Sequence, residues 1–291
     1  MKVLTLAVWG FLWTTTVAAE EVSKTMDAAA DGTVSISNTA GSVEVRGWSR
    51  NQVEVTGELG NRVEELVFAR DDDEIIIKVK VPRRNSGGIA SDLVVNVPEG
   101  SSLEVNTVSA EIEVSDVEGE QQLESVSGDI VTDAHGADME LGTVSGDIEI
   151  QGDNEPIRTR VSSVSGDIDT DSLAGEIVAE SVSGSITTVN GSFERASANT
   201  VNGDIVYHAR LLDDGRLNIE TINGSVDVDF GGDVSARIDI ETFNGAIRNC
   251  FGPEAVRTSK YAPGRELKFT EGGGSGRVTI QTLNGSVRLC K

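Results

Sequence analysis

A short pattern of apolar and polar positions recurs along the C-terminal two-thirds of this chain. Each copy reads apolar, Ser or Asn, Gly, polar, apolar, as in Val126-Ser127-Gly128-Asp129-Ile130, and the flanking residues alternate as in half-buried strands. From Val108 to Phe243 the copies recur with a period of about 18–21 residues, and a gap of two periods then leads to Leu283. The glycines form one column of turns: Gly128, Gly146, Gly166, Gly184, Gly203, Gly224, Gly245 and Gly285.

Two architectures are compatible with this pattern. Asn-Gly and Ser-Gly between apolar runs are typical of two-residue turns in β-hairpins. A ladder of hairpins, however, has no reason to keep a near-constant period with the same turn residue. A β-solenoid has one, because each coil must return one rung, about 4.8 Å, further along the axis. We therefore expect an all-β fold, a single-stranded right-handed β-solenoid with about 18–21 residues per coil, the hand following the rule for parallel crossovers.

The turn residues lead to two further expectations. Glycine is expected at every corner because the backbone there needs a positive φ angle, which glycine adopts without strain. The corners change from Ser-Gly-Asp before residue 170 to Asn-Gly after residue 200. We expect the stacked side chains of Asn202, Asn223 and Asn244 to share amide hydrogen bonds along the column, as asparagine ladders do.

The N-terminus has the pattern of a cleaved signal peptide. Lys2 precedes an apolar run from Val3 to Trp13, and small residues lead to Ala19. The run is about eleven residues long, whereas a helix needs about twenty to span a bilayer. We therefore expect residues 1–19 to be removed on export. The mature chain would then lie in the periplasm or outside the cell, with no membrane span.

The mature chain divides by regularity into two parts. Residues 20–100 are expected to form irregular N-terminal β coils, within which residues 64–70 fit either a short helix or another strand. Residues 101–291 are expected to form the regular solenoid with a C-terminal hairpin, made from residues 266–269, a Gly-rich turn and residues 277–280. Because exposed ends of a solenoid need capping, we assign that role to the N-terminal part and to this hairpin.

The composition is acidic and poor in aromatic residues. The formal net charge is -24 at pH 7, and aromatic residues make up 4% of the chain. Such a chain repels nucleic acids and anionic lipid surfaces, so neither is an expected partner.

Asp129, Asp147 and Asp167 stack like charges at one corner. We interpret them as a solvated acidic edge, with a column of Ca²⁺ sites as the alternative, and we expect no cofactor.

The two cysteines occupy equivalent places in the repeat. Cys250 and Cys290 each follow the glycine of a copy by five residues. Equivalent positions on adjacent coils lie within the range of a disulfide, and export favours oxidation. If residues 253–276 formed a complete coil, however, the sulfurs would lie two rungs apart. A disulfide therefore requires this segment to leave the stack, and we expect the bond to staple an exposed C-terminal coil.

The order of these motifs resembles a family of exported bacterial proteins named putative adhesins, a domain-of-unknown-function β-solenoid group. The stretches that carry the resemblance are Ser35–Trp48, Val95–Gly100, the Ser-Gly-Asp-Ile copies and Tyr261–Gly264. Together they cover nearly all of the mature chain. The resemblance implies a β-solenoid in the cell envelope or outside it, and it implies no reaction.

These observations favour a non-enzymatic exported envelope protein that presents a rigid β-solenoid surface for binding, adhesion or scaffolding. Its partner would be an unknown envelope protein or a glycan. A β-helix-type polysaccharide-acting enzyme is the alternative from another class, but residues 101–209 offer only Arg158, Arg160 and Arg195 as basic groups. We name no catalytic residue, since His135 and His208 have no partner at metal-ligand or triad spacing. The sequence does not separate an envelope stress or signalling accessory protein from the first reading.

Overall fold

Alternating apolar and polar residues form strands throughout the part of the chain that the structure describes. The computed structural model describes residues 20–83, 87–260 and 263–291. The expected signal peptide, residues 1–19, lies outside the described residues, as do the first two residues of the Tyr261–Gly264 stretch. The described residues form 23 strands and no helix, so residues 65–70 belong to a strand rather than a helix.

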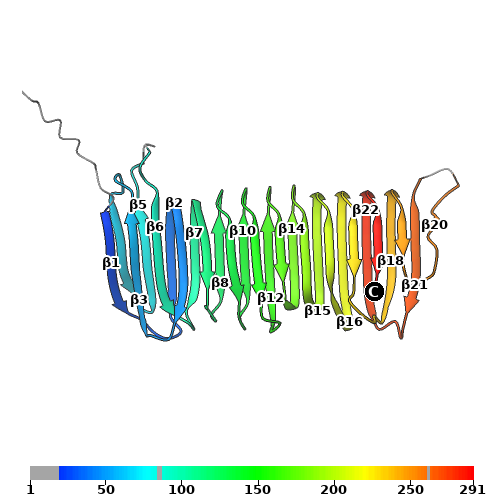
Figure 1. Ribbon diagram of the computed structural model, residues 1–291, viewed down its shortest axis with the longest axis horizontal. Coiled ribbons are helices and arrows are strands. Elements are labelled where there is room, and N and C mark those ends of the chain that lie inside the picture. The colour runs from blue at the N-terminus through cyan, green and yellow to red at the C-terminus, as the bar shows by residue number, and fades with distance from the viewer. Residues whose placement is uncertain (1–19, 84–86, 261–262) are drawn as a thin grey trace, which may run out of the picture.

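The strands stack into an elongated body in which each coil supplies one strand to each of two parallel ladders (Figure 1). The first ladder contains the N-terminal half of β7 (Ser102–Ser115), β8 (Gln121–Ser125), β10 (Met139–Thr143), β12 (Pro156–Ser163), β14 (Ala174–Ser181), the C-terminal halves of β15 (Ile186–Asn202) and β16 (Ile205–Asn223), β22 (Gly276–Asn284) and β18 (Ala236–Asn244). The second contains the remaining halves of β7, β15 and β16 with β9 (Ile130–Ala134), β11 (Ile148–Gly152), β13 (Ile168–Asp171), β17 (Val226–Asp229), β23 (Val287–Cys290) and β19 (Ile247–Asn249).

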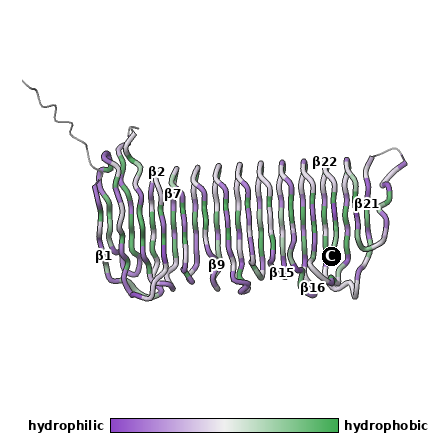
Figure 2. Tube along the Cα trace, viewed as in Figure 1, coloured by the Kyte–Doolittle hydropathy of each residue, from purple (hydrophilic) through white to green (hydrophobic). Residues whose placement is uncertain are grey.

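The core lies between the two ladders and is filled by every second residue of each strand (Figure 2). Leu123 of the first ladder and Ile130 of the second are both fully buried, as the alternation predicts. The largest buried side chains, Phe193, Tyr207 and Phe230, lie in contact, with ring centroids 6.0 and 6.4 Å apart. The Tyr207 hydroxyl donates to the Arg210 carbonyl at 3.3 Å, and burial raises the pKa of this phenol.

The column of turn glycines is explained by close contact rather than by backbone conformation. None of the eight glycines has a positive φ angle, so our expectation on this point is wrong. Each glycine instead lies directly against a carbonyl oxygen of the corner one rung away. A Cβ on Gly146 would collide with the Gly128 carbonyl oxygen, and a Cβ on Gly166 with that of Gly146. Hydrogen is therefore the only side chain that fits at this corner.

A column of buried hydroxyls lies beneath these turns. The Gly128 N–H donates to Ser125 Oγ at 2.8 Å, and the Gly146 N–H donates to Thr143 Oγ1 at 3.1 Å. The Thr200 hydroxyl donates to the Gly184 carbonyl one rung away, at 3.0 Å. A Ser or Thr stands three residues before every glycine of the column, so this motif is visible in the sequence, although our sequence analysis missed it. It satisfies polar backbone groups that the corner would otherwise leave buried.

At the C-terminal end, the order of coils in space differs from their order in the chain. β22 pairs in parallel with β16 on one side and with β18 on the other, so the last coil is inserted between two earlier ones. β21 (Arg265–Glu271) then covers the outer edge of β18 in antiparallel orientation and pairs with the short β20 (Val256–Arg257). Residues 266–269 and 277–280 therefore lie on opposite sides of β18, and the expected hairpin between them is wrong.

The N-terminal end shows the same exchange of order. β2 (Thr33–Trp48) lies between β7 and the later strands β5 (Glu74–Lys80) and β6 (Ser91–Pro98), all parallel to it. Antiparallel strands cover this end as well: β4 (Glu65–Asp71) pairs with β5, β3 (Gln52–Leu59) with β6, and β1 (Glu20–Asp27) with β3. The charged residues of β1 discourage pairing with a further strand at this edge.

Candidate binding surface

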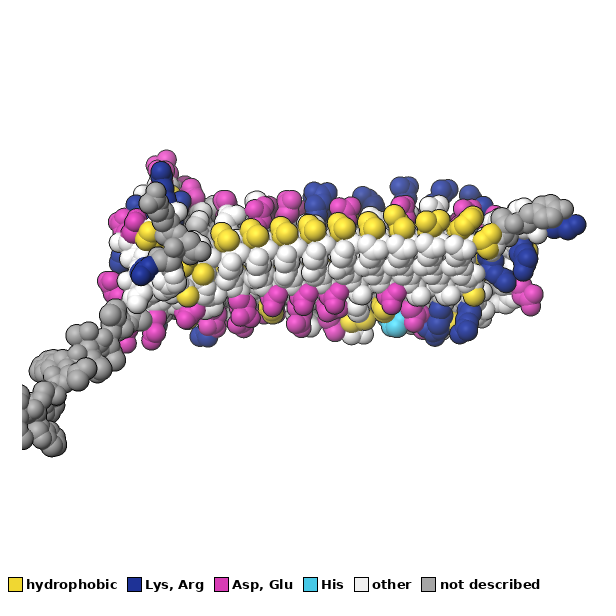
Figure 3. All heavy atoms as spheres, turned by 90° about the horizontal axis from the view of Figure 1, so that it is seen from above, with side chains coloured by type: hydrophobic (Ala, Val, Ile, Leu, Met, Phe, Trp, Pro, Cys, Tyr) yellow, Lys and Arg dark blue, Asp and Glu magenta, His cyan; other side chains and the backbone are white. Residues whose placement is uncertain are grey.

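The first apolar residue of each repeat points to solvent. Nine such side chains, 37% to 49% exposed, form one continuous row along the corner of the stack, which we call the apolar ridge (Figure 3). In spatial order it consists of Val108, Val126, Val144, Val164, Val182, Val201, Ile222, Leu283 and Phe243. Parity along the strand predicts this exposure: Glu124 is exposed and Ser125 is buried, so Val126 faces outward again. The apolar character of the position concealed this from our sequence analysis.

A groove of about 760 Å³ runs along the C-terminal half of the ridge. Its apolar lining consists of Val182, Val201, Ile222, Leu283 and Phe243. Thr258, Gly264 and Arg265 close it at the end of the stack, where the Thr258 N–H donates to the Gly264 carbonyl at 3.0 Å. The inserted last coil contributes Leu283, so the groove depends on the exchanged coil order. A volume of this size is in the range of ligand-binding clefts.

Acidic and amide side chains alternate along the other side of the groove. The outward residues two positions before the ridge are, in spatial order, Glu180, Asn199, Glu220, Gln281 and Glu241. The Lys268 ammonium lies 3.0 Å from Glu241 Oε1 and neutralises this outermost carboxylate. Glu180 and Glu220 form no ion pair within the described residues, although the Asn218 amide donates to Glu220 Oε1 at 3.1 Å. The groove therefore combines an apolar row with negative charge that no cation neutralises.

The carboxylates of the acidic corner accept hydrogen bonds from the backbone of the next coil. Asp129 Oδ1 accepts the Asp147 N–H at 2.9 Å, and Asp147 Oδ1 accepts the Asp167 N–H at 2.8 Å. Asp167 Oδ1 in turn accepts the Ser185 N–H at 2.7 Å. Each carboxylate thus binds the next corner, which offsets the repulsion between stacked charges. Within residues 20–83, 87–260 and 263–291, no group of three or more His, Cys, Asp and Glu side chains converges on a possible metal position.

The asparagine corners form the amide ladder that the sequence indicates, with one added member. The Asn223 amide donates to Asn202 Oδ1 at 2.8 Å, the Asn284 amide to Asn223 Oδ1 at 2.9 Å, and the Asn244 amide to Asn284 Oδ1 at 2.9 Å. Asn284 stands between Asn223 and Asn244 because its coil is inserted there.

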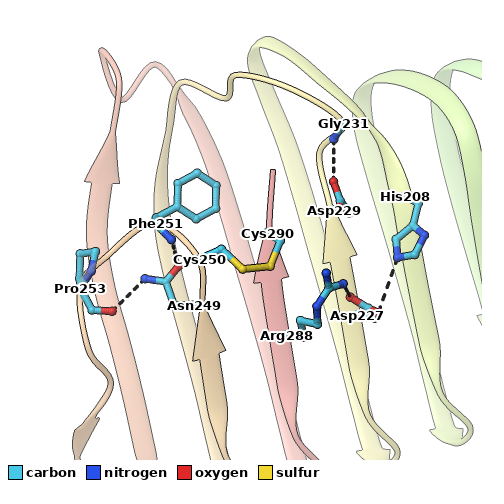
Figure 4. Close-up of a disulfide and its surroundings, with 10 residues drawn as sticks. All are labelled: His208, Asp227, Asp229, Gly231, Asn249, Cys250, Phe251, Pro253, Arg288 and Cys290. Carbon is cyan, nitrogen blue, oxygen red and sulfur yellow. Dashed lines mark hydrogen bonds and ion pairs between the residues drawn. A yellow bond between two sulfur atoms is a disulfide. The ribbon is translucent and has the colours of Figure 1, made fainter.

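Cys250 and Cys290 form a disulfide on the second ladder (Figure 4). Their Cα atoms are 4.9 Å apart, and the Cys250 N–H donates to the Leu289 carbonyl at 3.0 Å. The cysteines are neighbours because β23 pairs directly with β19. Residues 253–260 and 263–275 add no parallel coil to the stack, as we expected, and β21 within them covers the edge of β18 in antiparallel orientation. The bond ties β19, the end strand of this ladder among the described residues, to the inserted β23. It therefore staples the end coil of the stack, although the coil that ends the chain is an interior one.

Both histidines lie beside an acidic side chain one rung away, a pairing that the sequence analysis did not anticipate. His135 Nδ1 lies 3.1 Å from Asp153 Oδ2. His208 Nε2 lies 3.7 Å from Asp227 Oδ2, and the other oxygen of this carboxylate, Oδ1, binds Arg288 (Figure 4). The backbone N–H of Glu155 and the nearby His135 lower the pKa of Asp153. Neither imidazole bonds to a hydroxyl or thiol among the described residues, so neither pair forms a nucleophilic triad.

No helix among the residues described is long and apolar enough to cross a bilayer.

The sequence of this chain was compared with protein families and with known proteins. A family model described as Toastrack DUF4097 matches residues 32–289. None of the curated proteins matches the chain.

Two solved structures illustrate the similarity. The "putative lipid binding protein" from Parabacteroides distasonis ATCC 8503 is 14% identical, with a TM-score of 0.53 over 93% of this chain and 97% of its own. The "putative adhesin" from Bacteroides fragilis NCTC 9343 is 11% identical, with a TM-score of 0.44 over the same shares of the two chains. At such identities the likeness concerns the fold alone.

Proposed function

This chain belongs to the Toastrack DUF4097 family, and on that premise we propose that it is a non-enzymatic exported binding protein of the cell envelope. The signal-peptide pattern of residues 1–19 supports export to the periplasm or beyond. The stack is best understood as a right-handed solenoid of about 18–21 residues per coil, a rigid body whose outward columns repeat from coil to coil. Such a body suits recognition, because its side chains are held in fixed rows.

The apolar ridge and its groove carry this proposal. Soluble proteins rarely leave a continuous apolar row exposed unless it is covered by a partner. The carboxylates of Glu180 and Glu220 lie beside the ridge and have no ion pair within the described part of the chain. Charge complementarity therefore favours one occupant, an extended segment of a partner protein that carries both apolar and basic side chains.

Two features favour binding over catalysis in this groove. Its side chains are aliphatic, hydroxyl, amide and carboxylate groups on a flat ladder, with Phe243 as its aromatic member and Arg265 as its basic group at the closed end. Glu180 and Glu220 stand two strands apart on the same face, with Asn199 between them. Paired carboxylates of glycosidases instead flank the bond that they cleave. The polysaccharide-acting enzyme thus remains an alternative without a matching cluster in this groove.

The proposal is tested with defined peptides and fluorescence anisotropy. A labelled peptide of alternating leucine and lysine should bind, whereas alternating leucine and glutamate, or serine and lysine, should not. The double variant Ile222→Asn/Leu283→Asn should weaken binding about tenfold or more, because it removes two exposed apolar contacts. Val108→Asn is the matched control, since Val108 is 48% exposed in the same row but lies outside the groove.

The same assay separates the competing outcomes. A fatty acid or phospholipid that binds in preference to all three peptides would replace the peptide with a lipid as the occupant. Equal affinity of the double variant and the control for the leucine–lysine peptide would overturn the assignment of the groove. Thermal unfolding of each variant identifies any loss that is due to misfolding.

A further inference from the structure

Charge is distributed unevenly along the chain. Residues 101–194 carry 2 Lys and Arg against 21 Asp and Glu, whereas residues 195–291 carry 12 of each. The excess of negative charge therefore resides in the middle of the stack. Basic side chains gather at its C-terminal half, where Figure 3 shows them beyond the apolar row.

Four of these basic residues form a single row. Arg195 pairs in register with Arg216, Arg216 with Arg277, and Arg277 with Arg237, on the consecutive strands β15, β16, β22 and β18. All four side chains are exposed on the first ladder. The row lies at the opposite end of these strands from the apolar ridge, six residues away along each strand, or about 20 Å.

Three of the four arginines lack a counter-charge among the residues that the structure describes. Arg195 binds Glu176 Oε1 at 2.8 Å, but Arg216, Arg277 and Arg237 form no ion pair within the described residues. The nearest carboxylate along the strand of Arg237 is that of Asp239, which is engaged by Lys268 at 3.5 Å. Asp213 and Asp214 share a depression with Arg216, yet neither reaches it with an ion pair.

Packing does not require this row. Like charges on adjacent strands in register repel each other, and about 4.8 Å separates the rungs. The same ladder avoids such repulsion at the groove, where amides stand between Glu180, Glu220 and Glu241. Three successive unpaired cations therefore cost stability, and a bound anion with a matching row of charges would offset that cost.

We propose that this arginine row binds a linear acidic polysaccharide, a polyuronate or a chain of similar chemistry. Beside the arginines, Ser197, Asn218 and Thr279 form a parallel row of hydroxyl and amide groups. Together with Arg195, Arg216 and Arg277 they line a depression of about 310 Å³. A guanidinium offers a planar fork to a carboxylate, and the adjacent polar row can hydrogen-bond to sugar hydroxyls. This surface is separate from the groove and its ligand is of another class.

Two other polyanions fit this surface less well. Single-stranded nucleic acid binds through aromatic side chains on which its bases stack, and the residues that line this depression include none. A planar anionic membrane would meet the carboxylates of Glu194, Asp213 and Asp214 beside the row, whereas a narrow chain can follow the arginines alone.

Calorimetric titration of the full mature protein with polygalacturonate tests the proposal. Binding is expected to weaken as salt is raised, and to disappear with the fully methyl-esterified polymer, which has the same backbone without charge. Arg216→Gln/Arg277→Gln should weaken binding about tenfold, on the basis of two exposed charge pairs. Arg158→Gln is the matched control, because Arg158 lies in the same column but is already paired with Asp138 at 3.1 Å.

Stability provides a second, independent readout. Removal of two mutually repelling arginines should leave the melting temperature of Arg216→Gln/Arg277→Gln unchanged or raise it. A lower melting temperature would show that the row is structural and overturn the proposal. Tighter binding of single-stranded DNA or of phosphatidylglycerol vesicles than of polygalacturonate would also overturn it. Ile222→Asn/Leu283→Asn should retain polygalacturonate binding. The proposal for the groove and the proposal for the arginine row can therefore be refuted independently of each other.

Discussion

Val287 pairs in register with Val226, although strands β18 to β22 lie between them in the chain. On its other side Val287 pairs with Ile247, which belongs to a coil formed earlier in the chain. The last segment of the chain thus occupies a place between two coils that were formed by earlier residues. The coil of β18 and β19 connects to the rest of the stack through this insert.

Deletion of residues 276–291 should therefore release more than the deleted coil. Without β22, strand β18 keeps only its antiparallel partner β21 among the described strands, and the groove loses Leu283. Hydrogen exchange should show lost protection in β18, β19 and β21 and retained protection in β8 to β14. Retained hydrogen-exchange protection of β18 would mean that, without β22, this strand pairs directly with β16. Deletion of Lys291 alone is the control.

The disulfide should stabilise this end of the stack. Cys250→Ser/Cys290→Ser should lower the free energy of unfolding by about 2–4 kcal/mol, because the bond closes a loop of 40 residues in the unfolded chain. The loss should be local, with faster hydrogen exchange in β18 and β19 and no change in β8 to β12. Unchanged exchange at β18 and β19 would show that sheet pairing alone holds the insert.

The turn glycines should tolerate no side chain. Gly166→Ala places a methyl group against the Gly146 carbonyl oxygen and should destabilise the protein by about 1–3 kcal/mol, measured by denaturant unfolding. Gly142→Ala is the control, because its nearest neighbour would be Ser162 Oγ at 3.6 Å. Equal effects of the two substitutions would contradict the close-contact explanation.

The sequence predicted these corners only in part. The period, the glycine column and the asparagine ladder follow from spacing alone, because a repeated turn must stack on itself. The reason for glycine does not follow from spacing. A close contact with the neighbouring corner and a positive φ angle both require glycine, so the sequence cannot distinguish the two causes. The exchanged order of coils is also hidden. The repeat around Leu283 is as regular as the one around Ile222, and sequence spacing records chain order rather than spatial order.

The aspartate corners allow a matched pair of substitutions. Asp147→Asn keeps an oxygen that can accept the Asp167 N–H, whereas Asp147→Ala removes the acceptor, and both remove the same charge. We expect Asp147→Ala to be less stable than Asp147→Asn by about 1 kcal/mol in thermal or denaturant unfolding. Equal stability of the two variants would mean that the hydrogen bond from the Asp167 N–H to Asp147 contributes nothing to stability, and that Asp147 is only a solvated surface charge. Addition of Ca²⁺ that raises the melting temperature of the parent protein would instead favour the calcium interpretation.

The central claim is that the groove along the apolar ridge is the binding surface. Methyl-resolved NMR of the mature protein, titrated with the leucine–lysine peptide, tests it most directly. We predict shifts of the methyl signals of Val182, Val201, Ile222 and Leu283, with those of Val108 and Val126 unchanged, because the first four line the groove and the last two share the row outside it. Uniform shifts along the whole ridge, or shifts confined to other faces, would contradict the account.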